Sequence, residues 1–589
     1  MAGLEFAGPP LAQRVPDDLT IPQFMLETHH PLRPDQGSIP CLIEDETGRR
    51  VTLPELRTRT RLLAYALREK YGIGMCNQAH LWHATCRSLL ASFPGNEDVV
   101  LLCMPNDIDF PVAMWAVQYN GGIYTGANPG STADELLYQL QITEATMIVA
   151  HPSTYHTVVK AARLAGIPLD RVILPKPVSG IQADSIEDLE REYGGRDLAS
   201  SALKLAPGEG TTKIACLCMS SGTTGKPKAV AISHAAVIAN LVQLSSFNPP
   251  KPNATWSPGD VVLGILPLFH IAGLVFTASS FTQIPAIDLG ADLMMIAALG
   301  LILRVVPKFD FVSMLDSVVR HRIQHLILVP PIAVALCKHP AARGYDLTHV
   351  KFIGSGAAPL TSEVEDELQR IYPAKTGQAY GLTETSTIVS MVPFYEDGTS
   401  GSIGRLIPGV RVKLVKADGT QAGYDEPGEL VVKTPSLAMC YHKNAKATDE
   451  SFNEGWFRTG DEAKISRNGD VWITDRLKVG IDQSSGLPGV TGRVGRPAPV
   501  LPLPDDKSGE VPMAFVVLTE GALQRSKSSP EQAGEIKTSI QKLVADNKVR
   551  YKHLDGGIEF ADFIPKNPSG KILRRVLKEQ VAARLQAKL

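Results

Sequence analysis

Residues 220–228 read Ser-Ser-Gly-Thr-Thr-Gly-Lys-Pro-Lys and stand between two apolar runs, 214–219 and 229–232, that predict strands. Two glycines permit a tight loop with inward-pointing backbone N–H groups. The hydroxyls and lysines add hydrogen-bond donors and positive charge, which suits a polyphosphate. The Walker pattern does not fit, because Ser220 replaces its first glycine and Pro227 its Ser or Thr. We expect a phosphate-binding loop made by Ser220, Ser221, Gly222, Thr223, Thr224, Gly225, Lys226 and Lys228.

Short β-branched runs on both sides of this loop alternate with segments of helical periodicity. The runs cover residues 99–103, 146–150, 214–219, 261–266 and 325–329, and residues 361–371 carry an apolar stripe typical of a helix. Strands that alternate with helices predict an α/β fold with largely parallel sheets. After about residue 400, the runs 410–415, 429–432 and 471–474 are separated by Gly and Asp turns, which predicts a small antiparallel β subdomain.

The length, charge and residue composition of the chain limit the classes of protein to which it can belong. A chain of 589 residues is expected to form two or more domains. With 59 basic and 61 acidic residues, the net charge of −2 gives no support for a nucleic-acid partner or an anionic membrane surface. The most apolar run, residues 293–303, is too short for a membrane span and is interpreted as a buried helix. The eight cysteines show no zinc-ligand spacing.

Further motifs follow the loop in a fixed order. They are Leu-Pro-Leu-Phe-His-Ile-Ala-Gly-Leu (266–274), Gly-Ser-Gly-Ala-Ala-Pro-Leu (354–360), Gln-Ala-Tyr-Gly-Leu-Thr-Glu-Thr (378–385), Gly-Trp-Phe-Arg-Thr-Gly-Asp (455–461), Asp-Arg-Leu-Lys (475–478) and Pro-Lys-Asn-Pro-Ser-Gly-Lys (565–571). Together with the loop, they resemble the adenylate-forming enzymes: the acyl- and aryl-CoA synthetases, the luciferases and the adenylation domains of peptide synthetases. The resemblance covers roughly residues 30 to 580 and is greatest to the 4-coumarate-CoA ligase-like branch.

This resemblance implies two domains and a two-step reaction. Residues 1–475 would form a large N-terminal AMP-binding domain of α/β subdomains plus the antiparallel subdomain. Residues 476–589 would form a smaller, mobile α+β domain carrying a catalytic lysine. The implied reaction activates a carboxylic acid with ATP and Mg²⁺ to give an acyl adenylate, which then forms a thioester with coenzyme A. Rotation of the small domain would separate the two steps.

The motifs assign residues to the nucleotide and the metal. Glu384 is the type of carboxylate that holds Mg²⁺. The resemblance places Thr383 beside the α-phosphate. Asp461 offers two acceptor oxygens to the ribose hydroxyls. Tyr380 offers an aromatic face to adenine. The expected nucleotide-binding set is completed by Gln378, Ala379, Gly381, Arg476 and Lys478.

Two residues are expected to act on the acid. The resemblance places His270 near the acid and the phosphate, and Lys571 as the charge that bridges carboxylate and α-phosphate during adenylation. A small residue at 272, where plant coumarate enzymes commonly carry a bulkier aromatic, predicts a wide pocket for an aromatic or fatty acid. The expected pocket residues are Phe269, Ala272, Gly354, Gly356, Ala357 and Gly377.

Three stretches depart from the family pattern: residues 479–503, 75–95 and 281–304. Our hypothesis is that they are translated non-coding sequence or a frame slip. The first lies where the family shapes its thioester-forming site. Two alternatives to a CoA ligase therefore stay open: an adenylating enzyme that loads a separate carrier protein, and a catalytically impaired adenylate-binding homologue.

The chain ends Ala587-Lys588-Leu589, which resembles the Ser-Lys-Leu peroxisomal address. We expect recognition by the peroxisomal import receptor and peroxisomal localisation, with the cytoplasm as the alternative. Such an address favours fatty or specialised-metabolite acids as substrates.

Overall fold

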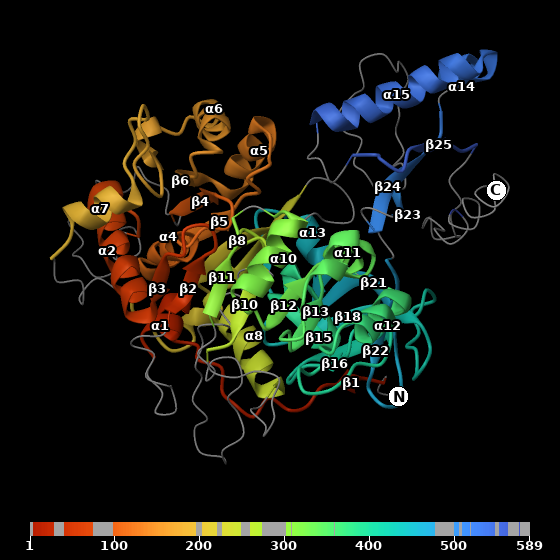
Figure 1. Cartoon of the computed structure of the whole chain (residues 1–589), viewed down its shortest axis with the longest axis horizontal. Coiled ribbons are helices and arrows are strands. Elements are labelled where there is room, and N and C mark those ends of the chain that lie inside the picture. Colours follow the sequence, from red (N-terminus) through yellow and green to blue (C-terminus); the bar gives the residue numbers. More distant parts are fainter. Residues whose placement is uncertain are drawn as a thin grey trace. The chain divides into compact units, whose positions relative to one another are not determined.

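A computed structural model describes residues 4–28, 40–74, 98–195, 203–220, 227–248, 259–271, 273, 302–307, 309–358, 360–476, 500–505, 509–518, 520–547, 553–562 and 577. The chain divides into two compact units (Figure 1). The first comprises residues 1–129, 133–220 and 228–474, and the second residues 130–132, 221–227 and 475–589. Among the described residues, no helix is long and apolar enough to cross a membrane.

A seven-stranded sheet organises the first part of the large unit. Its strand order is β19 (Cys440–Tyr441), β9 (Lys228–Ser233), β8 (Ile214–Ser220), β5 (Ile123–Gly126), β4 (Val99–Cys103), β6 (Ala145–Ala150) and β7 (Val172–Ile173). Neighbouring strands from β8 to β7 are parallel. All five residues of β4 are buried, because a parallel sheet covered on both faces needs a continuous apolar run. The strands expected at 99–103, 146–150 and 214–219 are confirmed.

Helices cover this sheet. They are α1 (Ile21–Leu26), α2 (Leu53–Tyr71), α4 (Phe110–Tyr119), α5 (Ala133–Thr143), α6 (Tyr155–Ala165), α7 (Ile186–Glu192) and α8 (His234–Phe247), with the short turns η2 (Leu169–Arg171) and η3 (Glu209–Thr211). Helix α4 is buried on every side, which fits its wholly apolar sequence apart from Gln118. Helix α2 ends at Gly72, whose φ of 73° gives the left-handed C-cap that glycine adopts freely.

A nine-stranded sheet forms the second part of the large unit. Its order is β16 (Arg405–Leu406), β15 (Thr387–Met391), β14 (Lys375–Leu382), β13 (Phe352–Ser355), β12 (His325–Leu328), β10 (Val261–Gly264), β11 (Ile302–Val305), β2 (Pro40–Glu44) and β3 (Arg50–Thr52). The strands from β14 to β2 are parallel. The helical segments α10 (Phe311–Arg320), α11 (Pro330–Lys338), η4 (Pro340–Gly344) and α12 (Ser362–Ile371) accompany it.

Strand β11 corrects two expectations about residues 281–304. Residues 302–304 pair with β10, and residues 303 and 304 also pair with β2, so they belong to the sheet and not to an inserted stretch. For the same reason, the last two residues of the apolar run 293–303 are strand and not buried helix. Because Ile-Leu-Arg-Val is a short buried apolar run with one paired charge, it fits a parallel strand as well as a helix end.

The antiparallel subdomain is confirmed. A six-stranded sheet joins β1 (Phe6–Ala7), β17 (Arg411–Val415), β18 (Gly428–Lys433), β21 (Trp456–Ile465) and β20 (Phe452–Asn453), with β22 (Val471–Arg476) paired to β21. The pairs β1–β17, β17–β18, β18–β21 and β20–β21 are antiparallel. Helix α13 (Ala445–Ser451) lies between β19 and β20 in the sequence.

The second unit combines strands β23 (Val500–Asp505), β24 (Gly509–Val516) and β25 (Ile558–Phe560) with helices α14 (Glu520–Ser528) and α15 (Pro530–Asn547). Small apolar clusters around Phe515 and Ala514 form its core. Residues 500–503, expected to belong to the irregular stretch 479–503, are paired with β24 over their whole length. The irregular stretch therefore ends earlier than the sequence indicated.

Candidate active site

Three of the predicted motifs lie at the carboxyl edge of the nine-stranded sheet. Strand β10 leads into the segment that contains Phe269 and His270, and β13 leads into residues 354–358. Gly354 stands opposite Gly377 in the parallel register of β13 and β14. Parallel α/β sheets bind ligands at the carboxyl ends of their strands. The topology therefore brings the expected pocket segments together at the edge where a ligand is expected.

The two ends of the phosphate loop lie beside Glu384. Strands β8 and β9 form an antiparallel pair in which Ser220 stands opposite Lys228, and the loop connects them. The Ser220 hydroxyl donates a hydrogen bond of 2.9 Å to Oε1 of Glu384. Residues 221–226 lie outside the described residues. The ends alone show that the loop starts and finishes next to the predicted metal-binding carboxylate.

A residue that the sequence analysis missed, Tyr441, holds the same carboxylate oxygen. Its hydroxyl donates to Oε1 of Glu384 at 2.9 Å, and both side chains are buried. The Lys228 ammonium lies 4.6 Å from the centre of the Tyr441 ring. Burial, together with the charge of Glu384, raises the pKa of Tyr441 far above its usual range, so the hydroxyl stays a donor. No sequence signal marks Tyr441, because β19 joins the site only through its pairing with β9.

The backbone around Glu384 is strained. Glu384 lies in the 3₁₀ turn η5 (Thr383–Thr385), which is closed by a 3.1 Å hydrogen bond from the backbone N–H of Leu382 to the Thr385 hydroxyl. The next two residues have positive φ: 53° at Ser386 and 112° at Thr387. For a β-branched residue this is an outlier that costs about 1–3 kcal/mol. The surrounding structure thus stabilises an unfavourable turn that fixes Glu384.

The residues expected to bind adenine and ribose are joined directly. The Tyr380 hydroxyl donates a 2.7 Å hydrogen bond to Oδ2 of Asp461. Tyr380 comes from β14 of the nine-stranded sheet and Asp461 from β21 of the antiparallel sheet, and Asp461 is only 2% exposed. Its backbone N–H donates to the Thr459 hydroxyl at 3.0 Å. One carboxylate thus connects two sheets at the predicted nucleoside position.

His270 is accessible to solvent, yet desolvation by the surrounding chain lowers its pKa, so the neutral imidazole is favoured.

The segment that precedes His270 is fixed by Asn106, which the sequence analysis also missed. Its side chain accepts from the backbone N–H of Leu268 at 2.9 Å and donates to the carbonyl of Leu266 at 3.0 Å. The strand-end position of Asn106, after the buried β4, was the sequence signal that could have identified it.

Other predicted residues are placed less directly. The Gln378 amide donates to Glu365 at 3.0 Å and accepts from the Leu360 N–H at 3.1 Å, so its side chain supports the segment after β13. A Cβ on Gly356 would lie 3.3 Å from the Ala379 carbonyl, so these two positions are neighbours. Ala357 has a φ of 69°, an unusual value for a residue with a side chain. Their roles toward a ligand stay predictions.

Several predicted residues cannot be located. Ala272, Lys478, Lys571 and the terminal residues 587–589 lie outside the described residues, as does the stretch 75–95. Arg476 is the last residue of β22, and its side chain lies outside the described part of the structure.

Glu384 fits a magnesium ligand. Its Oε1 is held by two hydroxyls, and among the described residues no hydrogen bond reaches its Oε2. In the described part of the chain, no group of three or more His, Cys, Asp or Glu side chains is arranged to hold a metal. A single protein carboxylate suits Mg²⁺, which retains several waters and binds substrate phosphates in place of a protein cage.

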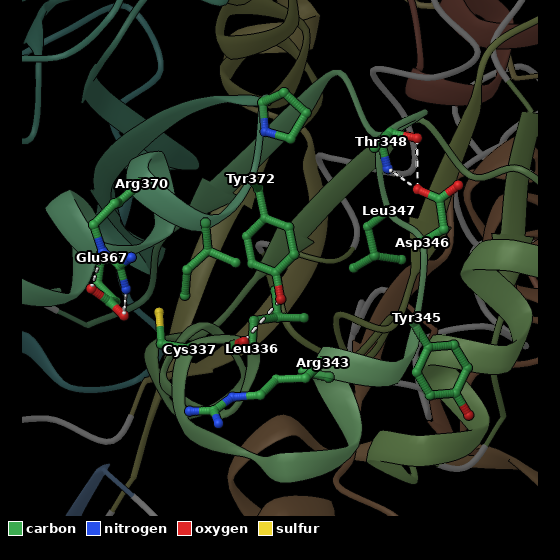
Figure 2. A pocket seen from close by; sticks show the side chains of 13 residues that line it. Leu336, Cys337, Arg343, Tyr345, Asp346, Leu347, Thr348, Glu367, Arg370 and Tyr372 are labelled. Atoms are coloured by element: carbon green, nitrogen blue, oxygen red, sulfur yellow. Dashed lines mark hydrogen bonds and ion pairs between the residues drawn. The ribbon is translucent and has the colours of Figure 1, made fainter.

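A separate cavity of about 390 Å³ lies among α11, η4 and α12 (Figure 2). Most of its charged side chains have partners: Arg370 pairs with Glu367, and Asp346 accepts from Thr348. Burial raises the pKa of its Cys337 thiol to about 11, so the thiol is not a nucleophile at neutral pH. The cavity contains none of the predicted site residues, and we do not assign it to the reaction.

Comparison with known proteins agrees with this geometry. Residues 88–442 match the model of the AMP-binding enzyme family, and residues 497–571 match that of the AMP-binding enzyme C-terminal domain. The chain belongs to the AMP-binding enzyme family. The first match covers most of the large unit, including Glu384, and also covers the phosphate loop.

The relatives of this AMP-binding enzyme cover nearly its whole length. It is 32% identical to the acyl-CoA ligase AKT1 of Alternaria alternata, over 98% of this chain and 96% of the relative. It is 30% identical to 4-coumarate–CoA ligase 5 of Oryza sativa subsp. japonica, over 97% and 96%. Its fold is similar to that of the amide bond synthetase McbA of Marinactinospora thermotolerans, with a TM-score of 0.67 and 23% identity over 92% of this chain and 98% of that one.

Proposed function

We propose that the protein is an acyl- or aryl-CoA ligase that forms AMP. In the first step, a carboxylate oxygen attacks the α-phosphorus of ATP, the α–β anhydride bond breaks, and pyrophosphate leaves. In the second step, the sulfur of coenzyme A attacks the acyl carbon, the bond to AMP breaks, and the thiol proton is released to solvent. The proposal is supported by relatives that are named as CoA ligases over nearly the full chain.

The single observation that carries the first step is the grouping of Ser220, Lys228, Tyr441 and Glu384. The first residue of a loop rich in hydrogen-bond donors bonds a buried carboxylate, and the last residue of the loop, Lys228, pairs with that first residue and lies over the ring of Tyr441, which bonds the same carboxylate. ATP and the acid are both anions, so catalysis must hold them together and neutralise charge at the α-phosphate. Lys228 supplies positive charge there, and Glu384 would hold Mg²⁺, which would neutralise the phosphates.

The remaining residues have separate tasks in this proposal. Tyr380 and Asp461 would bind the nucleoside, and the neutral His270 would lie beside the acid. Lys571 would bridge the carboxylate and the α-phosphate in the first step only. The bound acid would be aromatic or fatty, because the expected pocket residues are small and apolar.

The proposal is tested with purified protein, Mg-ATP, coenzyme A and a panel of aromatic and fatty acids, with acyl-AMP and acyl-CoA measured separately by mass spectrometry. Formation of acyl-CoA is expected. Accumulation of acyl-AMP without acyl-CoA would reject the ligase in favour of an enzyme that passes its adenylate to another acceptor. Nucleotide binding without pyrophosphate release would reject both in favour of an impaired homologue.

Lys571→Ala separates the two steps. We expect it to abolish acyl-AMP formation, while acyl-CoA still forms from supplied acyl-AMP and coenzyme A. Lys527→Ala, which alters an exposed lysine of α14 in the same unit, is the matched control and should retain both steps. Equal loss of both steps in Lys571→Ala would contradict the assigned role.

We also propose that Ala587-Lys588-Leu589 directs the enzyme to peroxisomes. A fluorescent protein that carries the last residues of the chain should enter peroxisomes, and the same fusion without the tripeptide should not. A diffuse distribution of the first fusion would reject the proposal.

A further inference from the structure

We propose that Asn106 is a positioning residue for acid binding: it holds the segment Leu266–His270 in the place from which Phe269 and His270 meet the acid. This inference rests on the proposed function, because it assigns those two residues to the acid. Asn106 would not contact the acid. It would act through the backbone of the segment it binds.

The side chain of Asn106 makes three hydrogen bonds to the backbone of residues 264–268. Its Nδ2 donates to the carbonyls of Gly264, at 3.2 Å, and Leu266, at 3.0 Å, while its Oδ1 accepts from the N–H of Leu268 at 2.9 Å. Asn106 is 7% exposed, so water does not readily replace these bonds. A buried amide with all these groups paired fixes a backbone path, since any shift would leave polar groups unsatisfied.

The bonds cross between two sheets. Asn106 follows β4 of the seven-stranded sheet, whereas Leu266–His270 follows β10 of the nine-stranded sheet. Gly126, at the end of β5, supports the same segment: a Cβ at that position would lie 2.6 Å from the Phe269 carbonyl. The carboxyl ends of β4 and β5 therefore form the surface against which Leu266–His270, the acid segment, packs.

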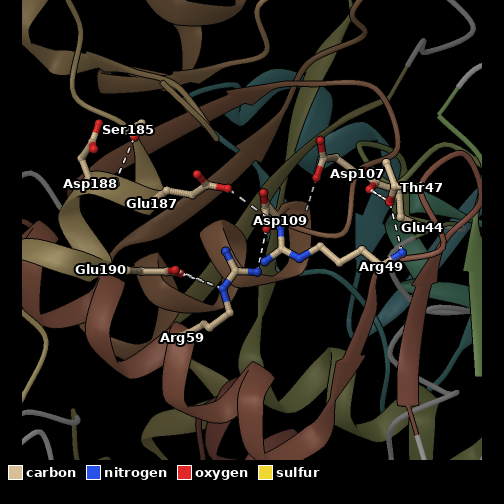
Figure 3. Close-up of polar contacts among 10 residues, drawn as sticks. All are labelled: Glu44, Thr47, Arg49, Arg59, Asp107, Asp109, Ser185, Glu187, Asp188 and Glu190. Carbon is tan, nitrogen blue, oxygen red and sulfur yellow. Dashed lines mark hydrogen bonds and ion pairs between the residues drawn. The ribbon is translucent and has the colours of Figure 1, made fainter. Parts of the chain in front are cut away.

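The loop that carries Asn106 is itself anchored on its other side. Arg59 of α2 lies between Asp109 and Glu190, with a 2.7 Å contact to Asp109 and a 3.0 Å contact to Glu190 (Figure 3). The Asp109 N–H donates to Asp107 at 2.8 Å, which tightens the loop. Arg59 and Asp109 are buried. Asn106 is thus attached to a rigid support, as a positioning residue requires.

Ile271, the residue that directly follows this segment, meets the turn that carries Glu384. The Thr387 hydroxyl contacts the carbonyl of Ile271 at 3.4 Å, from the strained turn described above. A displaced acid segment would therefore change the position of the acid relative to the phosphates. A misplacement of about 1 Å in reacting groups can lower a rate about 100-fold.

The test compares Asn106→Ala and Asn106→Asp with the matched control Asn120→Ala. Asn120 is a buried amide at the other end of α4, and its Nδ2 donates to the Ala64 carbonyl. Asn106→Asp keeps the acceptor for Leu268 but places an oxygen against two carbonyls. With the acid found best in the panel, both Asn106 variants should raise the KM for the acid about 10-fold or more and change the KM for ATP less than about 3-fold. The control should leave both constants unchanged.

Hydrogen exchange gives a readout that does not need activity. The Leu268 amide should exchange faster in Asn106→Ala and stay protected in Asn120→Ala. If the wild type activates no acid, the proposed function fails, and faster exchange still identifies Asn106 as the anchor of the segment. Unchanged exchange, unchanged KM for the acid, or equal changes in the two KM values would overturn the inference. Asn106→Ser, which can retain one hydrogen bond, replaces Asn106→Ala if that variant does not fold.

Discussion

Replacing Tyr441 by phenylalanine removes one oxygen from the centre of the site. The ring of Tyr441 packs edge-on against Phe452, with 5.5 Å between ring centres, and faces the Lys228 ammonium. Phenylalanine retains both contacts. The change therefore removes the hydrogen bond to Oε1 of Glu384, which the hydroxyl makes at 2.9 Å, and with it a smaller interaction of the hydroxyl with Ser451.

The expected loss can be worked from that bond. A hydrogen bond to a charged group contributes about 1.5–3 kcal/mol. Since about 1.4 kcal/mol corresponds to a factor of ten, the adenylation rate constant kcat/KM should fall about 10- to 150-fold. Ser220 still holds Oε1, so the carboxylate keeps one donor. The raised pKa of Tyr441 means that the hydroxyl is protonated throughout the neutral range, and the factor should not vary with pH there.

Pyrophosphate exchange measures the adenylation step, and electron paramagnetic resonance of Mn²⁺ with ATP measures cation binding without turnover. In Tyr441→Phe, the rate of pyrophosphate exchange and the affinity for Mn²⁺ should both decrease, because Glu384 loses a group that orients it. Tyr372→Phe is the matched control: this buried tyrosine donates to the neutral Leu336 carbonyl at 2.9 Å. Values of exchange and Mn²⁺ affinity within about threefold of wild type for Tyr441→Phe would refute the reasoning, given the size expected above.

Three further changes test stability. Burial lowers the pKa of His234 to about 3, so as the pH falls the unfolded chain protonates this histidine before the folded chain does. The free energy of unfolding should therefore decrease below pH 6.5, by up to about 1.4 kcal/mol per pH unit. Urea titrations should show a smaller decrease in the His234→Gln variant. Burial and a neighbouring carboxylate raise the pKa of Asp107 to about 6, so its charged form costs stability as the pH rises past its ordinary value of 3.8. Asp107→Asn should therefore gain up to about 3 kcal/mol at pH 7 and little at pH 3, and a loss at pH 7 would contradict this assignment. A Cβ on Gly381 would lie 1.5 Å from the Thr387 carbonyl, so Gly381→Ala should cost about 3 kcal/mol or more in thermal unfolding, whereas Gly344→Ala, with open space around it, should cost less than about 1 kcal/mol.

Local patterns predicted the elements and failed at their edges. The buried run 99–103 is a strand as expected, because a continuous apolar stretch needs cover on both faces. The C-terminal boundary of the apparent insertion 281–304 is wrong, since residues 302–304 belong to the strand that lies between β10 and β2. Pairing partners supplied by distant segments decided this boundary, and a single sequence contains no such information.

The sequence by itself determined the family and the order of the motifs, and it predicted the types of chemistry: a loop of donors for phosphates, one carboxylate for a metal and an aromatic residue for a base. These follow from residue type and spacing along the chain. Only the tertiary structure decided which groups support them. Tyr441 reaches Glu384 because β19 pairs with β9, and Asn106 reaches Leu268 because the ends of two parallel sheets meet. The first of these hydrogen bonds joins residues 57 positions apart in the sequence, and the second joins residues 162 positions apart. Such contacts depend on how the strands are arranged in the sheets, and that arrangement results from burial of the whole core.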